Sequence, residues 1–431
     1  MAVLNTEHIV WEERMERENE ARTARAAFAT ALDAAVDCAV LAPSSHNCQP
    51  WALARLAGDA REVAHAWLGT EADVEAGTEA EYLVLALDRR RELDSLAAHT
   101  VEMHVSCGAY WRMLLRSLAA RGWVATHVHT VEDGDRPEFG PRWPEHWTPL
   151  SVARLARGPA SGEDPTELLT LARGRHTNRY PYDSAPLEPG LLAELAERTG
   201  PTGQDQLPGR VNQGDPRTAV TTRHLTGARE RERFVSFLAR HAGRDFKNRD
   251  AWRETHSYLR FSEREERARA DGFTLTHLFG PMRGPFRLGA RLVLWPPVMR
   301  LLCLVGFHRF LAIGLATTAR RSPALVALGM AAKLPGLDDA LRGGERLADY
   351  WLAVTRAGLV LHPLSIVLQH EDLRRAVQRE LELPGRTFFL ARLGRPLRTA
   401  LPSPRRSGGG YRTVGTDADS GSGSVGPIRR G

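Results

Sequence analysis

The sequence predicts an α/β protein made of two related halves. Three observations support this fold class. Segments with helical and strand-like patterns alternate along the chain, and one helical segment with the same glycine spacing occurs twice. In addition, 42% of the 431 residues are hydrophobic and 26% are charged, a composition that suits a globular protein with two or three domains' worth of core and excludes a disordered chain.

The first half is expected to span residues 1–149. Its predicted elements are a helix at 23–41, strands at 51–56 and 81–87, a helix that starts at Gly108, and a strand at 123–130. Residues 133–149 are rich in proline, glycine, tryptophan and charge, which indicates a connection between the halves.

The second half is expected to span residues 150–406. Its later part contains the second copy of the repeated helix, an apolar segment at 359–368, a helix at 371–381, and a strand at 387–393 followed by Gly394-Arg395-Pro396. Residues 407–431 are rich in glycine and serine, which predicts a disordered tail.

The repeated helical segment runs from Gly108 to Gly122 and again from Gly344 to Gly358. Apolar residues occupy matching offsets in the two copies: Trp111, Leu114, Leu115 and Leu118, then Leu347, Tyr350, Trp351 and Val354. Both copies read as core helices that end in a glycine cap. The repeat favours a duplication, although one shared spacing in a glycine-rich chain can also arise by chance.

The segment APSSHNCQPW at residues 42–51 gathers hydrogen-bonding side chains in a short loop. Pro43 and Pro50 restrict its backbone. The polar side chains near the prolines are Ser44, Ser45, Asn47 and Gln49. Such a loop can bind the polar edge of an aromatic ring, although the same residue types also form ordinary turns.

The segment RHTNRYPYD at residues 175–183 places Arg175, Thr177 and Arg179 at alternating positions. In an extended backbone, alternate side chains point to the same side, so two guanidinium groups and a hydroxyl share one face. That face suits a phosphate, whereas the alternative is a solvated surface rich in arginine. Together, the two motifs favour a cofactor with both a phosphate and an aromatic ring.

The two motifs, in this order, resemble those of the Acg-type branch of the nitroreductase superfamily, whose members bind FMN and fuse two nitroreductase halves in one chain. The resemblance implies a nitroreductase-like fold whose halves form an intramolecular pseudo-dimer. It assigns the isoalloxazine ring to Ser45, Asn47 and Gln49, with Ser44 beside them, and the ribityl phosphate to the motif of Arg175, Thr177 and Arg179. One flavin per chain is expected, because each motif occurs once.

The end of the predicted last strand also resembles this branch, in which a Gly-x-Pro terminates the strand and the following arginines reach the phosphate. Arg405 and Arg406 are the candidates for that role. The alternative is a basic tail that contacts nothing.

Residues 274–334 form a strongly apolar region with three interpretations: a buried helical lid over the flavin, which we favour, an interfacial membrane helix, or a partner surface. A membrane span is not expected, because Arg300, His308 and Arg309 interrupt the region and its uninterrupted apolar runs fall short of the roughly 20 residues that a span needs. The interfacial helix is the least favoured of the three interpretations, so contact with a membrane is not expected.

Charge, cysteine content and histidine spacing limit the classes of ligand and the cellular location to be expected. The net charge is +6, but the arginines are scattered, so nucleic acid is not implied. The four cysteines lack Cys-x-x-Cys spacing, and a charged stretch occupies the N-terminus, which favours a reduced, cytoplasmic protein. His99, His104, His127 and His129 lack a partner at metal-site spacing, so no metal is expected.

These features predict an FMN-dependent oxidoreductase that passes two electrons from NADPH or NADH to a small molecule such as a quinone or nitroaromatic, with no side chain required as acid or base. Two alternatives remain: a protein that sequesters flavin without catalysis, and a dehydrogenase or desaturase of a specialised metabolite. The oligomeric state is expected to be a monomer with its internal pseudo-dimer, or a homodimer.

Overall fold

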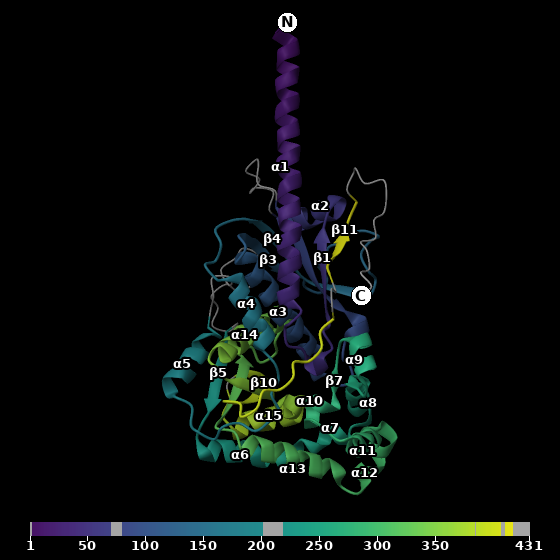
Figure 1. The fold of residues 1–431 in the computed structure, drawn as a ribbon, viewed down its shortest axis with the longest axis vertical. Coiled ribbons are helices and arrows are strands. Elements are labelled where there is room, and N and C mark those ends of the chain that lie inside the picture. Colours follow the sequence, from purple (N-terminus) through teal and green to yellow (C-terminus); the bar gives the residue numbers. More distant parts are fainter. Residues whose placement is uncertain (1, 70–79, 201–218, 384, 407–409, 417–431) are drawn as a thin grey trace.

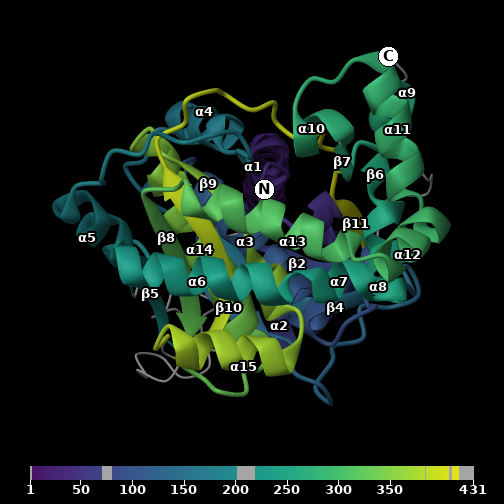
Figure 2. The ribbon, with the colours of Figure 1, turned by 90° about the horizontal axis from the view of Figure 1, so that it is seen from below.

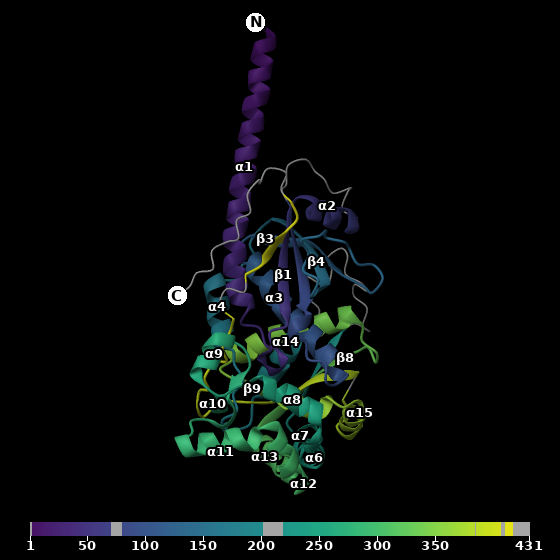
Figure 3. The ribbon, with the colours of Figure 1, turned by 90° about the vertical axis from the view of Figure 1, so that its right-hand side faces the viewer.

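The computed structural model describes residues 2–69, 80–200, 219–383, 385–406 and 410–416. Two sheets lie at different heights along the long axis of the molecule, and the helices α3 (Ala98–Ala119) and α14 (Leu337–Arg356) lie between them (Figure 1). The side view shows the same order of layers (Figure 3). The chain therefore has a mixed α/β fold, as the alternation of sequence patterns predicted.

The five-stranded sheet has the order β11-β1-β2-β4-β3 and is antiparallel except for the pair β1–β11. Its strands are β1 (Trp51–Leu56), β2 (Glu81–Asp88), β3 (Trp123–Thr130), β4 (Trp147–Arg157) and β11 (Arg412–Val414). Alternate residues of β2 point to opposite faces. Leu83 and Leu85 join the core beneath α1 (Ala2–Ala39) and α3, and Tyr82 and Val84 join the core beneath α2 (Gly58–Trp67).

The four-stranded sheet has the order β5-β8-β10-β9 and is antiparallel throughout. Its strands are β5 (Val220–Leu225), β8 (Ala324–Met330), β9 (Val360–Pro363) and β10 (Arg386–Gly394). Val326 and Leu328 of β8 pack toward α14, while Leu325 and Ala327 pack toward helices on the other face. Both faces of the central strand are therefore buried.

Most of the remaining helices cover the second sheet or extend one end of the molecule, as the view from below shows (Figure 2), whereas α4 (Pro165–Gly174) packs against α1 and α14. The others are α5 (Pro189–Glu197), α6 (Ala228–His241), α7 (Gly243–Lys247), α8 (Arg249–Ser257), α9 (Glu263–Arg269), α10 (Leu275–Phe279), α11 (Gly284–Leu294), α12 (Pro296–Leu304), α13 (Phe307–Arg320) and α15 (Glu371–Glu380). Three short helical turns, η1 (Ser45–Asn47), η3 (Arg89–Arg91) and η6 (Ser365–Leu368), and the two-residue strands β6 (Leu259–Arg260) and β7 (Phe273–Thr274) complete the described elements.

The helices α3 and α14 pack backbone against backbone at the two glycines that open the repeated segments. A Cβ atom on Gly108 would overlap the carbonyl of Leu341, and a Cβ atom on Gly344 would overlap the carbonyl of Val105. Each glycine thus meets the residue three positions before the other glycine. Such reciprocity is what a local twofold axis produces.

The second glycines of the repeat end their helices in the same way. Gly122 and Gly358 have φ angles of 75° and 69°, a left-handed conformation that terminates a helix readily when the residue is glycine. The strands β3 and β9 follow directly. The glycine caps predicted for both copies are therefore present.

An ion-pair network joins α3 to α14 beside the glycine contact. Asp349 of α14 accepts hydrogen bonds from Arg112 at 2.8 Å and from Arg116 at 2.8 Å, both on α3. Burial alone would raise the pKa of Asp349, but the two guanidinium groups lower it below its ordinary value. The network fixes the register of the helices, because a shift along either axis would leave a buried carboxylate without partners.

The structure corrects several expected boundaries. The proposed division at residue 149 falls inside β4, and because β4 pairs with both β2 and β3, the first sheet extends to Arg157. The expected N-terminal helix at 23–41 begins at Ala2 instead.

Two other expectations are wrong in part. Residues 274–334 are not wholly a helical lid, because residues 324–330 form β8, one of the two interior strands of the second sheet. The tail at 407–431 is not wholly disordered, because residues 412–414 form β11 beside β1. Residues 407–409 and 417–431 lie outside the described part of the chain.

Gly344→Ala is expected to lower the free energy of unfolding by about 1–3 kcal/mol, because one methyl group must separate two helices in backbone contact. Urea unfolding followed by circular dichroism measures this change. The control is Gly289→Ala in α11, where an added Cβ meets no atom within 4 Å and should stabilise the helix by about 0.5–1 kcal/mol. Equal effects of the two substitutions would rule out close packing at Gly344.

Candidate functional site

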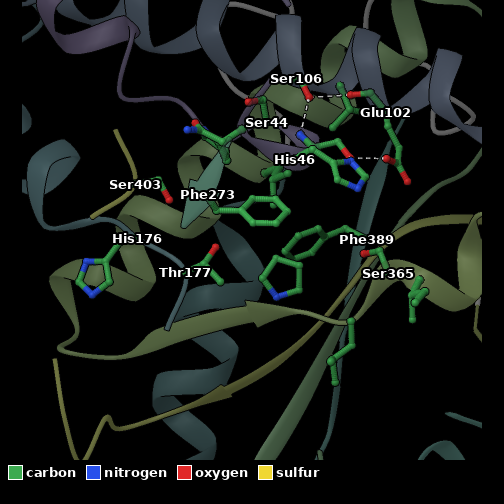
Figure 4. A pocket seen from close by; sticks show the side chains of 18 of the residues that line it. Ser44, His46, Glu102, Ser106, His176, Thr177, Phe273, Ser365, Phe389 and Ser403 are labelled. Atoms are coloured by element: carbon green, nitrogen blue, oxygen red, sulfur yellow. Dashed lines mark hydrogen bonds between the residues drawn. The ribbon is translucent and has the colours of Figure 1, made fainter. Parts of the chain in front are cut away.

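A cavity of about 380 Å³ lies where the two sheets and the helices between them meet the C-terminal segment. This volume is in the usual range for small-molecule sites. Figure 4 shows Ser44, His46 and Glu102 on one side of the cavity and Thr177 on the other, with the rings of Phe273 and Phe389 between them. The cavity thus combines polar ends with an aromatic middle.

The cavity brings together seven of the nine residues that the sequence predicts as cofactor ligands. They are Ser44, Ser45, Asn47, Arg175, Thr177, Arg179 and Arg405. Segments separated by more than a hundred residues therefore meet at one site.

The loop that carries the first motif has a strained backbone. His46, Asn47 and Gln49 have φ angles of 50°, 53° and 52°, in the left-handed region that costs a residue other than glycine about 1–2 kcal/mol. Strain of this kind persists only where the surroundings enforce it, and it concentrates at functional sites.

Contacts from three other segments hold this loop. From α3, Ser106 Oγ accepts a hydrogen bond from the backbone N–H of Ser45 at 3.3 Å. The Asn47 amide donates to the carbonyls of Gly272 and Pro404, each at 2.9 Å. These contacts orient the polar side chains of the loop before any ligand binds.

The second motif is extended, as predicted. Thr177 forms an isolated bridge with Leu361, and the N–H of Asn178 donates to the carbonyl of Leu361 at 2.9 Å. Arg175, Thr177 and Arg179 all line the cavity, whereas the buried Asn178 donates to the carbonyl of Arg398 instead. Alternate side chains therefore share one face of the segment.

Neutral groups surround the three arginines of the cavity. Arg175 is buried, donates to the carbonyl of Leu41 at 2.8 Å and lies 4.8 Å from the ring centre of Trp351. Arg179 donates one long hydrogen bond of 3.4 Å to the carbonyl of His277.

Arg405 donates at 2.6 Å to Asn47 Oδ1. Within the described part of the chain, no carboxylate forms an ion pair with Arg405 or with either of the other two arginines of the cavity. Of the four arginines that line the cavity, Arg175, Arg179 and Arg405 therefore have no carboxylate in direct contact, and the fourth, Arg173, is exposed.

Burial without a counter-charge lowers the pKa of each of these guanidinium groups. The pKa falls to about 10 for Arg179 and for Arg405, and that of Arg175 falls well below its ordinary value, with a further contribution from nearby Arg405. A desolvated cation is unfavourable without a counter-charge, and Arg405 adds a like charge near Arg175, so binding of an anion would relieve both costs. The phosphate of FMN is such an anion, so these residues fit the group that the sequence motifs imply.

Gln49 and Arg406 do not line the cavity. Gln49 is fully buried and donates to the carbonyl of Ala270 at 2.9 Å, while its Oε1 accepts from the N–H of Arg406 at 3.1 Å. The guanidinium of Arg406 donates to the carbonyls of Gln49 and Trp51. In the structure these two residues hold the C-terminal segment against the loop.

Glu102 is a cavity residue that the sequence motifs did not identify. It lies on α3 and accepts a hydrogen bond of 2.6 Å from the hydroxyl of Ser45, and burial raises its pKa. Burial likewise lowers the pKa of neighbouring His46 to about 4, with His99 adding to the shift, so His46 is neutral at physiological pH. The signal in the sequence was a glutamate followed by Ser106 one turn later, within a helix whose other residues are mostly buried.

Cys48, which lies inside the first motif, packs as a small apolar side chain. It is fully buried in the core beneath α3, and burial raises the pKa of its thiol. An enclosed thiol of this kind acts as a small packed side chain rather than as a reactive group.

A curated protein resembles most of the chain. The chain is 30% identical over 387 residues to the probable NAD(P)H nitroreductase PigM of Serratia sp., and the alignment covers 88% of this chain and 92% of PigM. No protein-family model matches the chain.

Solved structures resemble only part of the fold. The FMN-dependent nitroreductase NfnB of Mycobacterium smegmatis, in complex with NADPH, is 15% identical with a TM-score of 0.33 and covers 55% of this chain and 93% of its own. A nitroreductase-like protein of Bacillus cereus is 12% identical with a TM-score of 0.30 and covers 55% of this chain and 89% of its own. Similarity at this level carries no argument about the site.

Arg179→Met is expected to leave the cofactor-free protein at least as stable as the wild type while weakening FMN binding roughly 10- to 100-fold. Methionine keeps much of the volume and removes a poorly compensated buried cation, whereas FMN loses a charge-assisted contact worth about 1.5–3 kcal/mol. Urea unfolding and a fluorescence titration with FMN measure the two effects.

Arg173→Met is the matched control, since Arg173 lines the same cavity but is exposed and should alter FMN affinity less than about threefold. Unchanged FMN affinity in Arg179→Met, or collapse of its fold, would remove the assigned role.

Glu102→Gln is expected to stabilise the cofactor-free protein at neutral pH. Because burial raises the pKa of Glu102 above 4.5, the folded protein retains this proton to a higher pH than the unfolded chain does. Wild-type stability therefore falls as the pH rises from about 4.5 toward the raised pKa, and glutamine, which still accepts from Ser45, removes that loss.

Urea unfolding over a pH series should show a gap between variant and wild type that widens from acidic to neutral pH. The exposed Glu197→Gln serves as control. A constant gap would mean that Glu102 titrates alike in the folded and unfolded chains.

Proposed function

The chain belongs to the nitroreductase family, and we propose that it is an FMN-dependent oxidoreductase that transfers two electrons from NADPH or NADH to a quinone, a nitroaromatic or another planar acceptor. The observation that carries the proposal is a set of three arginines without carboxylate partners, one buried and two partly buried, around one cavity with aromatic walls. An anionic, planar cofactor satisfies both features of that cavity.

The residues of the cavity divide into groups by the part of FMN that each would bind. Arg175 and Arg179, with the hydroxyl of Thr177 between them, would bind the phosphate. Ser44, Ser45 and Asn47 would contact the polar edge of the ring. Arg405 would lie between the phosphate-binding residues and the ring-binding residues, because its guanidinium donates to Asn47 Oδ1 and its charge lowers the pKa of Arg175.

When bound, FMN supplies the electron-transfer chemistry, and the protein supplies position, charge and a dry site. Phe273, Phe389 and Trp351 line the middle of the cavity and exclude water from it. Glu102 keeps a proton at Oε1 or Oε2 to a higher pH than an exposed glutamate would, because its carboxyl is buried. The cavity can therefore hold a proton close to the ring edge.

We also assign the chain to the Acg-type branch, with two fused halves and one flavin at their seam. Three observations support this assignment: the reciprocal contact of Gly108 and Gly344, the paired caps at Gly122 and Gly358, and the occurrence of one ligand motif in each half. A monomer follows most simply, because the chain supplies both sides of the seam. A cytoplasmic location, where NADPH and NADH are available, is part of the same proposal.

An absorbance spectrum of the purified protein, repeated anaerobically after NADPH and then NADH, tests the proposal. A bound flavin whose absorbance bleaches with either nucleotide is the expected result. Arg175→Ala should lose most of the flavin absorbance on purification, whereas the exposed Arg198→Ala should retain it.

A flavin that neither nucleotide reduces would favour the sequestering alternative. Flavin reduced by a metabolite but not by NADPH or NADH would favour the dehydrogenase or desaturase. Absence of flavin even after incubation with FMN would refute the cofactor assignment itself.

A further inference from the structure

The helices α11, α12 and α13 form the end of the molecule opposite the tip of α1 (Figures 1 and 3). Nine large apolar side chains in or directly after these helices are more than half exposed. These residues are Phe286, Leu288, Leu292, Trp295, Leu301, Leu304, Val305, Phe310 and Ile313. A soluble protein rarely gathers so many exposed apolar side chains in one place unless something binds them.

The inner sides of the same helices are packed, so the exposed side chains are not an unfolded core. Met299 and Cys303 of α12 join a core cluster with Trp252 of α8. Ala312 and Ala316 of α13 pack against the second sheet and α6. The three helices therefore present an apolar outer surface on a folded support.

This end of the molecule also carries positive charge without compensation. From residue 272 to residue 337 the chain contains no aspartate or glutamate. The exposed arginines of this surface are Arg283, Arg287, Arg291, Arg300 and Arg309. Among the described residues, no carboxylate forms an ion pair with any of them. Between residues 272 and 337, the one arginine that forms an ion pair with another described residue is Arg320, whose guanidinium lies 2.8 Å from a carboxylate oxygen of Glu232 on α6.

The geometry of these helices excludes a simple span. They contain 11, 9 and 14 residues, whereas a membrane-spanning helix needs about 20. No single helix among the described residues is long and apolar enough to cross a membrane, and the pair α12 and α13, which passes that test together, is bent by 93°. Short helices with exposed apolar and basic side chains suit a position in the plane of the membrane interface.

We propose that the surface formed by α11, α12 and α13 docks on a membrane that carries anionic phospholipids. The apolar side chains would enter the interface, and the arginines would contact the phosphate groups of the lipids. Charge complementarity selects this occupant over a second copy of the chain, because two such surfaces would oppose arginine with arginine and contribute no carboxylate. The proposal stands independently of the proposed redox function.

Sedimentation with lipid vesicles tests the docking surface in the full chain. The wild type should sediment with vesicles of phosphatidylcholine and phosphatidylglycerol, should bind pure phosphatidylcholine vesicles at least tenfold more weakly, and should lose binding as salt is raised. The double variant Leu304→Asp with Val305→Asp should lose at least tenfold in binding, since both side chains are largely exposed at the end of α12.

Matched variants separate the surface from general effects. Leu334 is as exposed as Leu304 and Val305, but it follows the end of β8 that is remote from α13. The Leu334→Asp variant should therefore bind vesicles as the wild type does. Arg287→Gln and Arg291→Gln should each weaken binding about fivefold, whereas Arg198→Gln in another part of the surface should not. Circular dichroism on each variant confirms that the fold is retained.

Two results would overturn the proposal. One is the absence of binding to anionic vesicles by the wild type. The other is a dimer in sedimentation equilibrium that the Leu304→Asp, Val305→Asp variant dissociates, with no difference between the two vesicle types, which would assign the surface to a second copy of the chain.

Discussion

The reciprocal contact of Gly108 and Gly344 is the constraint on which the rest of the structure depends. It brings two helices into backbone contact and so sets how far apart their two sheets lie. α3 then carries Glu102 and Ser106 to the cavity, and α14 carries Trp351 to the same cavity. The position of the cavity depends on the close contact between α3 and α14. The ion pairs of Asp349 keep these two helices in register.

Two features of the cavity lower the stability of the fold locally. The loop at residues 44–49 holds three residues other than glycine in the left-handed region, and three arginines lie beside it without carboxylates. Neither feature stabilises the fold by itself. Both are typical of sites arranged in advance for a ligand, in which the surrounding core holds groups in positions that only the ligand makes favourable.

Much of the fold was readable from local sequence patterns. The strand at 123–130 and the helix that begins at residue 371 were predicted within a residue or two, because apolar periodicity is a local signal. The glycine spacing of the repeat predicted two related core helices, and both are present. The strand β11 was missed, because three residues in a glycine-rich tail acquire a strand conformation only by pairing with β1.

In the site, too, features set by neighbouring residues were predicted, whereas features set by residues far apart in the sequence were not. The alternation of Arg175, Thr177 and Arg179 predicted a shared face, because side-chain direction in an extended segment follows from residue number. Gln49 was placed at the ring by its residue type, yet its left-handed backbone turns its amide toward Ala270. Glu102 was missed because its environment is created by Ser45, fifty-seven positions away, and by the depth of the cavity, neither of which sequence spacing reveals.

A seam made within one chain has a consequence for evolution. Subunits of a symmetric pair share one gene, so every substitution appears on both sides of the axis. Here the residues on the two sides of the glycine contact are encoded separately and can change independently. The polar loop at residues 42–51 lies on one side, and the extended segment at 175–183 and the arginine-rich apolar surface lie on the other, while the contact between the two sides holds at any dilution of the protein.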